Sequence, residues 1–253
     1  MKKNPKPRIG IFDLTDCEGC ELEVINFREK LLDLLEGVEI VSWRLAQGKD
    51  AGSFDVAFIE GTPITLEEQA FLKNIRDNSK ILVALGACAC LGGIPGIIRD
   101  EERPRIYREV YPSDYKPRGV ESKPLSAYVK VDYFLDGCPV DSTRELERVL
   151  CDLISGKMPE TPDHPVCLDC KVAGNTCLLA NDIPCLGPII QGGCGAFCVS
   201  HGKHCYGCYG LVKDANFERM VERLNEIQSE KKTQNLLSMF LSEMPEYKRL
   251  YEQ

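Results

Sequence analysis

Three apolar runs in this 253-residue chain lead directly to cysteines. The run at residues 9–14 precedes the pair Cys17 and Cys20, a second run ends at Cys88, and a third ends at Cys138. If the three runs are parallel strands of one sheet, their carboxyl ends lie on one edge, which is where open α/β sheets bind ligands. We therefore predict that these four thiols converge on one site.

The chemistry of that site is not decided by its spacing alone. A C-x-x-C pair such as Cys17 and Cys20 occurs in thioredoxin-like redox centres, zinc knuckles and iron–sulfur sites. Cys90 follows Cys88 by two residues, so it is an alternative ligand at this stage.

The apolar pattern alternates between strand-like and helix-like periods, which is typical of a βαβ series. We expect strands at residues 9–14, 38–43, 55–61, 81–87 and 129–137, and helices at 21–35, 65–75 and 142–154. Five strands with interleaved helices favour a flavodoxin-like, doubly wound order, with a proline-rich connection at 95–123 before the last strand. Flavin binding is the usual alternative for this fold, but residues 15–20 lack a phosphate-cradling run of small and hydroxyl side chains.

The composition changes after residue 157, so we predict one domain at residues 1–157 and a second at 158–253. Between residues 159 and 210 periodicity is weak while proline, glycine and cysteine are dense. We expect metal centres to replace a hydrophobic core there. Proximity in sequence favours two sets of four ligands, although interleaved sharing and a zinc ribbon are alternatives. These sets are Cys167, Cys170, Cys177 and Cys185, and Cys194, Cys198, Cys205 and Cys208.

Composition and charge exclude several classes of protein. No apolar run approaches the ~20 residues of a membrane span, and a net charge of -8 argues against nucleic-acid binding. The start of the chain shows no export signal, so we expect a cytoplasmic protein. In that compartment fourteen cysteines favour metal ligands over disulfides. We predict that one of them, Cys151, is a core residue of helix 142–154.

These motifs resemble those of the small, electron-transferring subunit of nickel–iron hydrogenases, and the resemblance covers most of the chain. The motifs that carry it are Cys17-x-x-Cys20 followed by Glu21, Gly86-Ala87-Cys88-Ala89, Gly137-Cys138-Pro139, Cys185-Leu186-Gly187-Pro188, Gly193-Cys194 and Cys205-x-x-Cys208.

The resemblance implies three [4Fe-4S] clusters, a hydrogenase large subunit that holds the nickel–iron centre, and a flavin or iron–sulfur carrier subunit. It implies Cys88 rather than Cys90 as a ligand. Where many exported members have histidine and proline, this chain has Cys167 and Cys198, as in cytoplasmic multisubunit enzymes of the sulfhydrogenase delta and F420-non-reducing types. The implied ligands are a proximal set (Cys17, Cys20, Cys88, Cys138), a medial set (Cys194, Cys198, Cys205, Cys208) and a distal set (Cys167, Cys170, Cys177, Cys185).

Two rival functions stay open. A zinc-stabilised binding module would use the same cysteines without redox chemistry. A quinone-reductase subunit of the respiratory complex I type would share the first domain, but we expect it to lack the eight-cysteine segment.

Other polar and aromatic residues receive less specific predictions. His164, His201 and His204 lie near ligand cysteines, but with eight thiols present we do not assign them as ligands. We expect Glu18 and Glu21 to be ordinary exposed charges and Trp43 to be core. The amphipathic runs 214–227 and 233–251 predict helices that pack on this chain or on a partner subunit.

Overall fold

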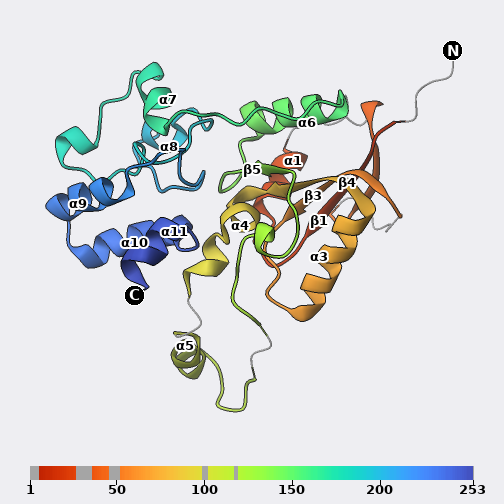
Figure 1. Ribbon diagram of the computed structural model, residues 1–253, viewed down its shortest axis with the longest axis horizontal. Coiled ribbons are helices and arrows are strands. Elements are labelled where there is room, and N and C mark those ends of the chain that lie inside the picture. The colour runs from red at the N-terminus through yellow and green to blue at the C-terminus, as the bar shows by residue number, and fades with distance from the viewer. Residues whose placement is uncertain (1–5, 27–35, 46–51, 99–101, 117–118, 253) are drawn as a thin grey trace.

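The computed structural model describes residues 6–26, 36–45, 52–98, 102–116 and 119–252. Five parallel strands form one sheet in the order β2-β1-β3-β4-β5 (Figure 1). This is the predicted flavodoxin-like order, so the fold prediction is confirmed. The strands are β1 Arg8–Asp13, β2 Glu39–Trp43, β3 Phe54–Glu60, β4 Ser79–Leu85 and β5 Tyr133–Leu135.

Helices cover both faces of the sheet. Successive side chains of a strand point to opposite faces, so each face presents apolar side chains that helices bury. Val24 of α1 (Gly19–Ile25) and Leu150 of α6 (Glu147–Ile154) share one core with Ile11 and Phe58. On the other face, Leu72 of α3 (Leu66–Asn78) packs in a second core. Figure 1 shows α6 above the sheet and α3 below it.

The boundaries of these elements follow local signals in part. Thr65 caps α3 in a capping box with Glu68, as its position predicted, although the helix continues three residues past the expected end. The last strand is shorter than expected, and α6 is preceded by a π-helical turn, Ser142–Leu146. The predicted helix 21–35 begins as α1, but residues 27–35 lie outside the described residues.

The proline-rich connection contains helical structure that the pattern did not reveal. It holds α5 (Arg103–Val110), which has no buried residue, and three short helices lie near it: α4 (Gly86–Leu91), η1 (Ile94–Ile97) and η2 (Leu125–Ala127). The prediction for Cys151 was wrong. Its thiol is exposed, because α6 buries only the side that carries Val149, Leu150 and Leu153.

The cysteine-rich segment is not without a core, which corrects the expectation that metal alone replaces one. Its regular structure is short: α7 (Val166–Val172), η4 (Leu179–Asn181) and α8 (Phe197–Ser200). Val166, Leu186 and Ile190 nevertheless pack with Phe217 and Leu237 from the C-terminal helices in a third hydrophobic core.

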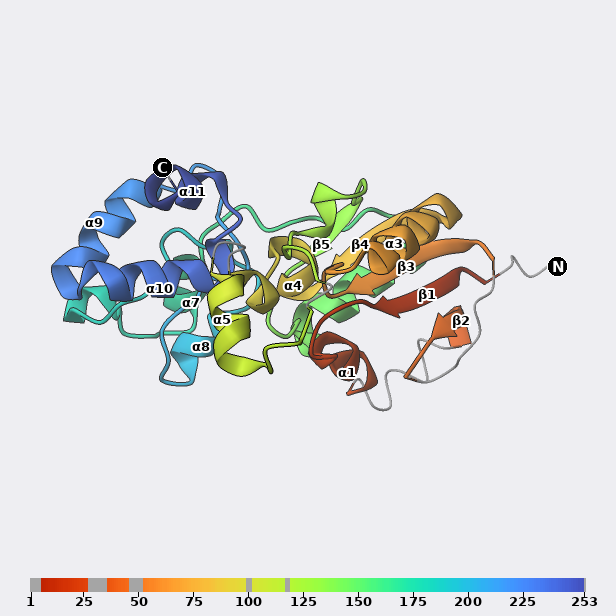
Figure 2. The ribbon, with the colours of Figure 1, turned by 90° about the horizontal axis from the view of Figure 1, so that it is seen from below.

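The C-terminal helices pack on their own chain, as one of the two predicted alternatives had it. They are α9 (Phe217–Ile227), α10 (Glu230–Leu241) and α11 (Pro245–Tyr251), and the single helix expected at 233–251 is therefore two. Pro245 lies at the first position of α11, where a missing N–H costs nothing. Figure 2 shows these helices and the cysteine-rich segment at one end of the sheet.

The two parts of the chain are in direct contact. Phe240 of α10 is buried in the core that α3 shares with β4, and α10 also contacts α4 and η1. Nothing in the part of the chain that the structure describes forms a helix both long and apolar enough to cross a membrane.

Candidate metal centres

The proximal set comes from three loops at one edge of the sheet. Cys17 and Cys20 follow β1, Cys88 lies in α4 directly after β4, and Cys138 follows β5. The strand register aligns Glu60 at the end of β3 with Asp13 and Leu85, so these loops start at one level. Burial raises the pKa of Cys88 to about 12, and the Cys138 and Cys17 thiols act in the same direction. Because the Cys20 and Cys88 thiols also act on one another, the structure places the four predicted ligands near one another.

Cys90 is buried in the second core. Its fully buried thiol lies 3.5 Å from the Ala84 carbonyl oxygen, to which it donates. The Asp136 carboxyl group and the Cys20 thiol are further neighbours, and burial raises the pKa of that carboxyl to about 7. Cys90 is thus a residue of the second core, while the Cys88 thiol interacts with those of Cys17 and Cys138.

A glycine makes room for the proximal thiols. Gly86 has a φ of 83°, and a Cβ atom there would overlap the Cys20 sulfur. Any side chain at this position would require a strained backbone conformation and would also overlap the sulfur. Only glycine therefore lets the backbone come so close to Cys20.

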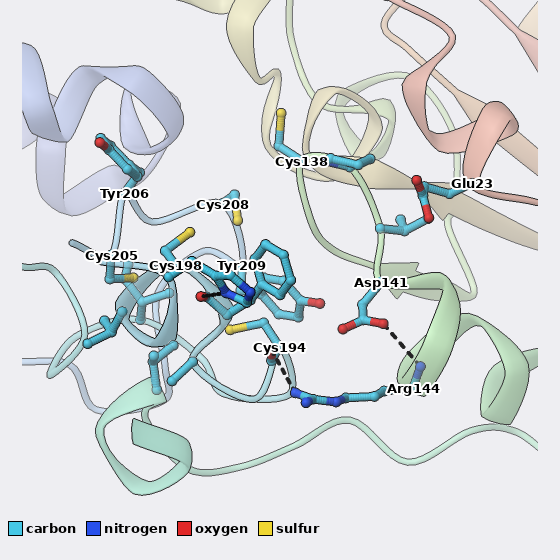
Figure 3. A pocket seen from close by; sticks show the side chains of 18 residues that line it. Glu23, Cys138, Asp141, Arg144, Cys194, Cys198, Cys205, Tyr206, Cys208 and Tyr209 are labelled. Atoms are coloured by element: carbon cyan, nitrogen blue, oxygen red, sulfur yellow. Dashed lines mark hydrogen bonds between the residues drawn. The ribbon is translucent and has the colours of Figure 1, made fainter. Parts of the chain in front are cut away.

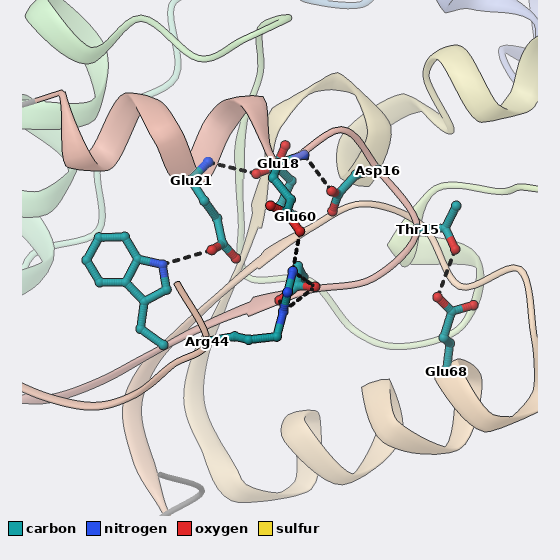
Figure 4. Close-up of polar contacts among 9 residues, drawn as sticks. Thr15, Asp16, Glu18, Glu21, Arg44, Glu60 and Glu68 are labelled. Atoms are coloured by element: carbon teal, nitrogen blue, oxygen red, sulfur yellow. Dashed lines mark hydrogen bonds and ion pairs between the residues drawn. The ribbon is translucent and has the colours of Figure 1, made fainter. Parts of the chain in front are cut away.

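Glu60, which the sequence reasoning missed, holds the loop that carries Cys20. Its carboxylate oxygens accept the backbone N–H groups of Cys20 at 3.0 Å and of Glu21 at 2.7 Å. Figure 4 shows the bond to Glu21. These N–H groups are at the start of α1, where a negative charge is stabilising. The sequence signal that could have identified Glu60 is an acidic residue at the end of the apolar β3 run.

Glu21 is fully buried, which corrects the expectation of an exposed charge. Its Oε2 accepts a hydrogen bond from the Trp43 indole at 2.8 Å, and its Oε1 is a buried oxygen without a partner (Figure 4). Burial raises the pKa of Glu21 to about 7. Trp43 is core, as predicted.

The medial set surrounds a cavity of about 450 Å³. All four sulfur-bearing side chains of the set line it, together with Cys138, Arg144 and Tyr209 (Figure 3). Burial raises the pKa of Cys194, Cys198, Cys205 and Cys208 above the ordinary thiol value. Four such thiols stay deprotonated most easily when metal charge compensates them.

The distal set gathers around α7. This helix carries Cys167 and Cys170, and the sulfurs of Cys167 and Cys185 both lie within 4 Å of the position that a Cβ atom on Gly187 would take. Burial raises the pKa of Cys167 to about 11, with further contributions from the thiols of Cys185, Cys170 and Cys177. These four cysteines therefore lie near one another. Because the Cys185 thiol also acts on those of Cys198 and Cys205, the division of the eight cysteines into two sets stays a prediction.

Hydrogen bonds from backbone N–H groups connect each set to the next. The Cys205 N–H donates to the Cys185 sulfur at 3.4 Å, which joins the medial and distal sets. The Gly137 N–H, beside Cys138, donates to the Cys208 carbonyl oxygen at 3.2 Å. This second bond joins the loop that follows β5 to the segment of the medial set, which therefore lies between the proximal and distal sets.

Four cysteine sulfurs per set and the roomy medial cavity are the donor type and the space that an iron–sulfur cluster needs. Among the described residues, no three His, Cys, Asp or Glu side chains lie close enough to hold a single metal ion.

Each histidine has a ring nitrogen next to an oxygen. The oxygen is Asp169 Oδ1 for His164, the Phe197 carbonyl for His201 and the Cys205 carbonyl for His204.

Comparison with known proteins identifies the family. Residues 17–151, just over half of the chain, match the family described as NADH ubiquinone oxidoreductase, 20 Kd subunit. The chain is 41% identical to sulfhydrogenase 2 subunit delta of Pyrococcus furiosus, with 92% of this chain and 98% of that protein aligned. The chain belongs to the family of hydrogenase small subunits.

Further proteins that are similar to this small subunit are also parts of hydrogenases. It is 31% identical to one subunit of the F420-non-reducing hydrogenase vhu of Methanococcus voltae, over 83% of this chain and 84% of that protein. Among solved structures, a chain of an NAD+-reducing [NiFe]-hydrogenase in the H2-reduced state superposes with a TM-score of 0.54 at 30% identity. That match covers 62% of this chain and 96% of the solved chain. The cysteine-rich segment falls within the extent of the sulfhydrogenase match, which favours a hydrogenase over the complex I alternative.

Proposed function

We propose that this small subunit is the electron-transfer subunit of a [NiFe] hydrogenase and that it holds three [4Fe-4S] clusters. The proximal, medial and distal sets are the proposed ligands, four cysteines to each cluster. When bound, the clusters would carry single electrons between the nickel–iron site of the large subunit and a carrier subunit that contains flavin or iron–sulfur groups.

The observation that supports this proposal is a row of contacts that joins the three proposed sets. The Gly137 N–H, beside Cys138, donates to the Cys208 carbonyl oxygen at 3.2 Å, and the Cys205 N–H donates to the Cys185 sulfur at 3.4 Å. A zinc module needs its sites to be stable but has no need for them to form a row. Electron transfer needs the row itself, because each step must cover a short distance.

Side chains around the three sets fix the positions of the cysteines and limit their contact with water. Glu60 fixes the start of α1, and therefore Cys20, through two hydrogen bonds. Leu186 and Ile190 pack beside the medial and distal cysteines in the third core, which keeps water from one side of those sites. Reduced thiols in such number suit a cytoplasmic enzyme, and we place this subunit there.

The first experiment is to purify the complex or the chain without oxygen and to measure iron, zinc, sulfide and the visible spectrum. We expect a brown protein with about twelve iron atoms per chain and no stoichiometric zinc. A colourless protein with bound zinc would overturn the proposal in favour of the binding module.

A substitution at Cys198 tests the assignment of the medial set. Cys198 is the second residue of α8, where the backbone N–H has no partner within the helix, so proline is tolerated there. Because a site with three thiolates tends to lose the fourth iron, Cys198→Pro should remove about one iron per chain and produce the paramagnetic resonance signal of an oxidised three-iron cluster. An unchanged iron content would show that Cys198 is not a ligand.

A further inference from the structure

Asp169 lies between two cysteines of the distal set, but its side chain binds the backbone on either side of a cysteine of the medial set. It is part of α7, between Cys167 and Cys170. Its Oδ2 accepts the backbone N–H groups of Gly193 and Gly195 at 2.9 and 3.1 Å. These two glycines flank Cys194, so one carboxylate oxygen holds both sides of a medial ligand.

His164 completes this attachment. Its Nε2 lies 2.9 Å from Asp169 Oδ1, and its backbone carbonyl accepts the Gly192 N–H at 2.7 Å. Only 16% of the Asp169 side chain is exposed, so water competes little for its oxygens. Hydrogen bonds to a carboxylate of this kind are about twice as strong as those between neutral groups.

The turn that carries Cys194 needs such an attachment, because no regular element contains it. Gly193 and Gly195 have φ angles of 122° and 60°, and Ala196 follows with a φ of 54°. A hydrogen bond of this turn to the first part of the chain is weaker: Arg144 Nη1 lies 3.3 Å from the Cys194 carbonyl oxygen, and the Arg144 side chain is exposed (Figure 3).

We propose that Asp169 is a positioning residue for the medial cluster, which it serves by holding the Cys194 turn against the helix of the distal set. The inference rests on the proposed function, because it assigns Cys194 to a cluster. It also gives the aspartate charge a role. Asp169 lies near the Cys194 thiol and acts on it electrostatically, so its negative charge disfavours adding an electron to the medial site.

Three variants of the anaerobically purified protein test the proposal. Asp169→Ala removes both the hydrogen bonds and the charge. Asp169→Asn keeps an oxygen for the glycine amides and offers an N–H group to His164, but removes the charge. Leu168→Ala changes an exposed neighbour between the same two cysteines and is the matched control.

The readout is alkylation of each cysteine, followed by mass spectrometry, because an iron-bound thiolate is protected. In Asp169→Ala we expect the medial cysteines to become alkylated about tenfold faster than in the wild type, the effect of losing roughly one charge-assisted hydrogen bond. The distal cysteines should stay protected, and Leu168→Ala should behave as the wild type. A distal set that reacts as fast as the medial set, or a medial set that stays protected, would overturn the proposal.

The asparagine variant separates positioning from charge and does not depend on the alanine variant folding. We expect Asp169→Asn to keep all twelve thiols protected and to raise the midpoint potential of the medial cluster in a redox titration. An unchanged medial potential, or the loss of medial protection, would overturn the inference. Failure of the proposed function would be seen separately, as a wild-type protein that contains no iron, with its thiols either reactive or protected by zinc.

Discussion

The sheet and the cysteine-rich segment position their thiols in different ways. At the sheet edge, the segments that carry Cys20 and Cys88 follow strands with buried residues, such as Ile11 of β1 and Ala84 and Leu85 of β4. In the cysteine-rich segment, the helices beside the ligands have seven residues or fewer, and their core is completed by side chains such as Phe217 from far along the chain. Isolated helices that short are not stable in water.

This difference teaches that one chain supports its metal sites on two kinds of scaffold. We expect the proximal site to rest on a core that forms without metal. We expect the medial and distal sites to need metal, the C-terminal helices and attachments such as Asp169 at the same time. Perturbations should therefore separate the two regions.

Iron removal should produce the largest difference between them. After anaerobic chelation, we expect amide hydrogen exchange to become fast throughout α7 and α8, because metal binding there is part of the folding free energy. The amides of β1, β3 and β4 should stay protected. If α7 and α8 kept their protection without iron, the third core alone would be sufficient, and the distinction between the two scaffolds would fail.

Truncating the third core should have a smaller but still large effect. Phe217 is completely buried, so Phe217→Ala should lower the free energy of unfolding of this region by about 3–5 kcal/mol. We expect the medial and distal sets to lose iron while the proximal set keeps it. The measurements are denaturant unfolding and iron content, followed by alkylation of the twelve ligand cysteines.

A matched substitution on the same C-terminal helices controls for general damage. Leu250 in α11 is 38% exposed, so Leu250→Ala should change neither stability nor iron content by a measurable amount. The reciprocal variant is Leu135→Ala in β5, which removes a completely buried side chain three residues before Cys138. It should affect the proximal set first, and equal loss from all three sets would contradict the comparison.

The sheet region could be predicted from the sequence because its signals are local. Apolar runs of strand length separated by helix-like periods indicated the strand order, and cysteines at strand ends indicated the shared edge. Helix α5 and the break before Pro245 were missed, although the proline at the start of each helix was visible. Those signals were weak because neither helix has a long apolar stripe.

The remaining features depend on residues that are distant in sequence. Nothing near Glu21 indicates that Trp43 covers it, and nothing near Asp169 indicates that residues 193–195 approach it. The third core joins residues 166–190 to residues 217–247, so the pattern of the cysteine-rich segment alone suggested that it had no core. Contacts of this kind arise from tertiary folding, which no local periodicity encodes.

The smallest expected effect concerns Glu21 and pH. Its pKa rises from an ordinary value of 4.5 to about 7 on folding, mainly through burial. The folded state therefore binds more protons than the unfolded state between these values, and stability falls as the pH rises through this window. The total loss is up to about 3 kcal/mol, since one pKa unit corresponds to about 1.4 kcal/mol.

Glu21→Gln should remove this pH dependence, because glutamine is neutral and its oxygen still accepts the Trp43 hydrogen bond. Compared with the wild type, the variant should gain stability at pH 8 but not at pH 5, as measured by urea unfolding. Glu39→Gln, on an exposed residue of β2, is the control and should leave the pH profile unchanged. If Glu21→Gln lost the same stability at both values, the Glu21 side chain would act only through its hydrogen bond. The sheet region would then contain no group at this position whose titration changes its stability. The two regions would in that case differ only in their responses to iron removal and to truncation of the third core.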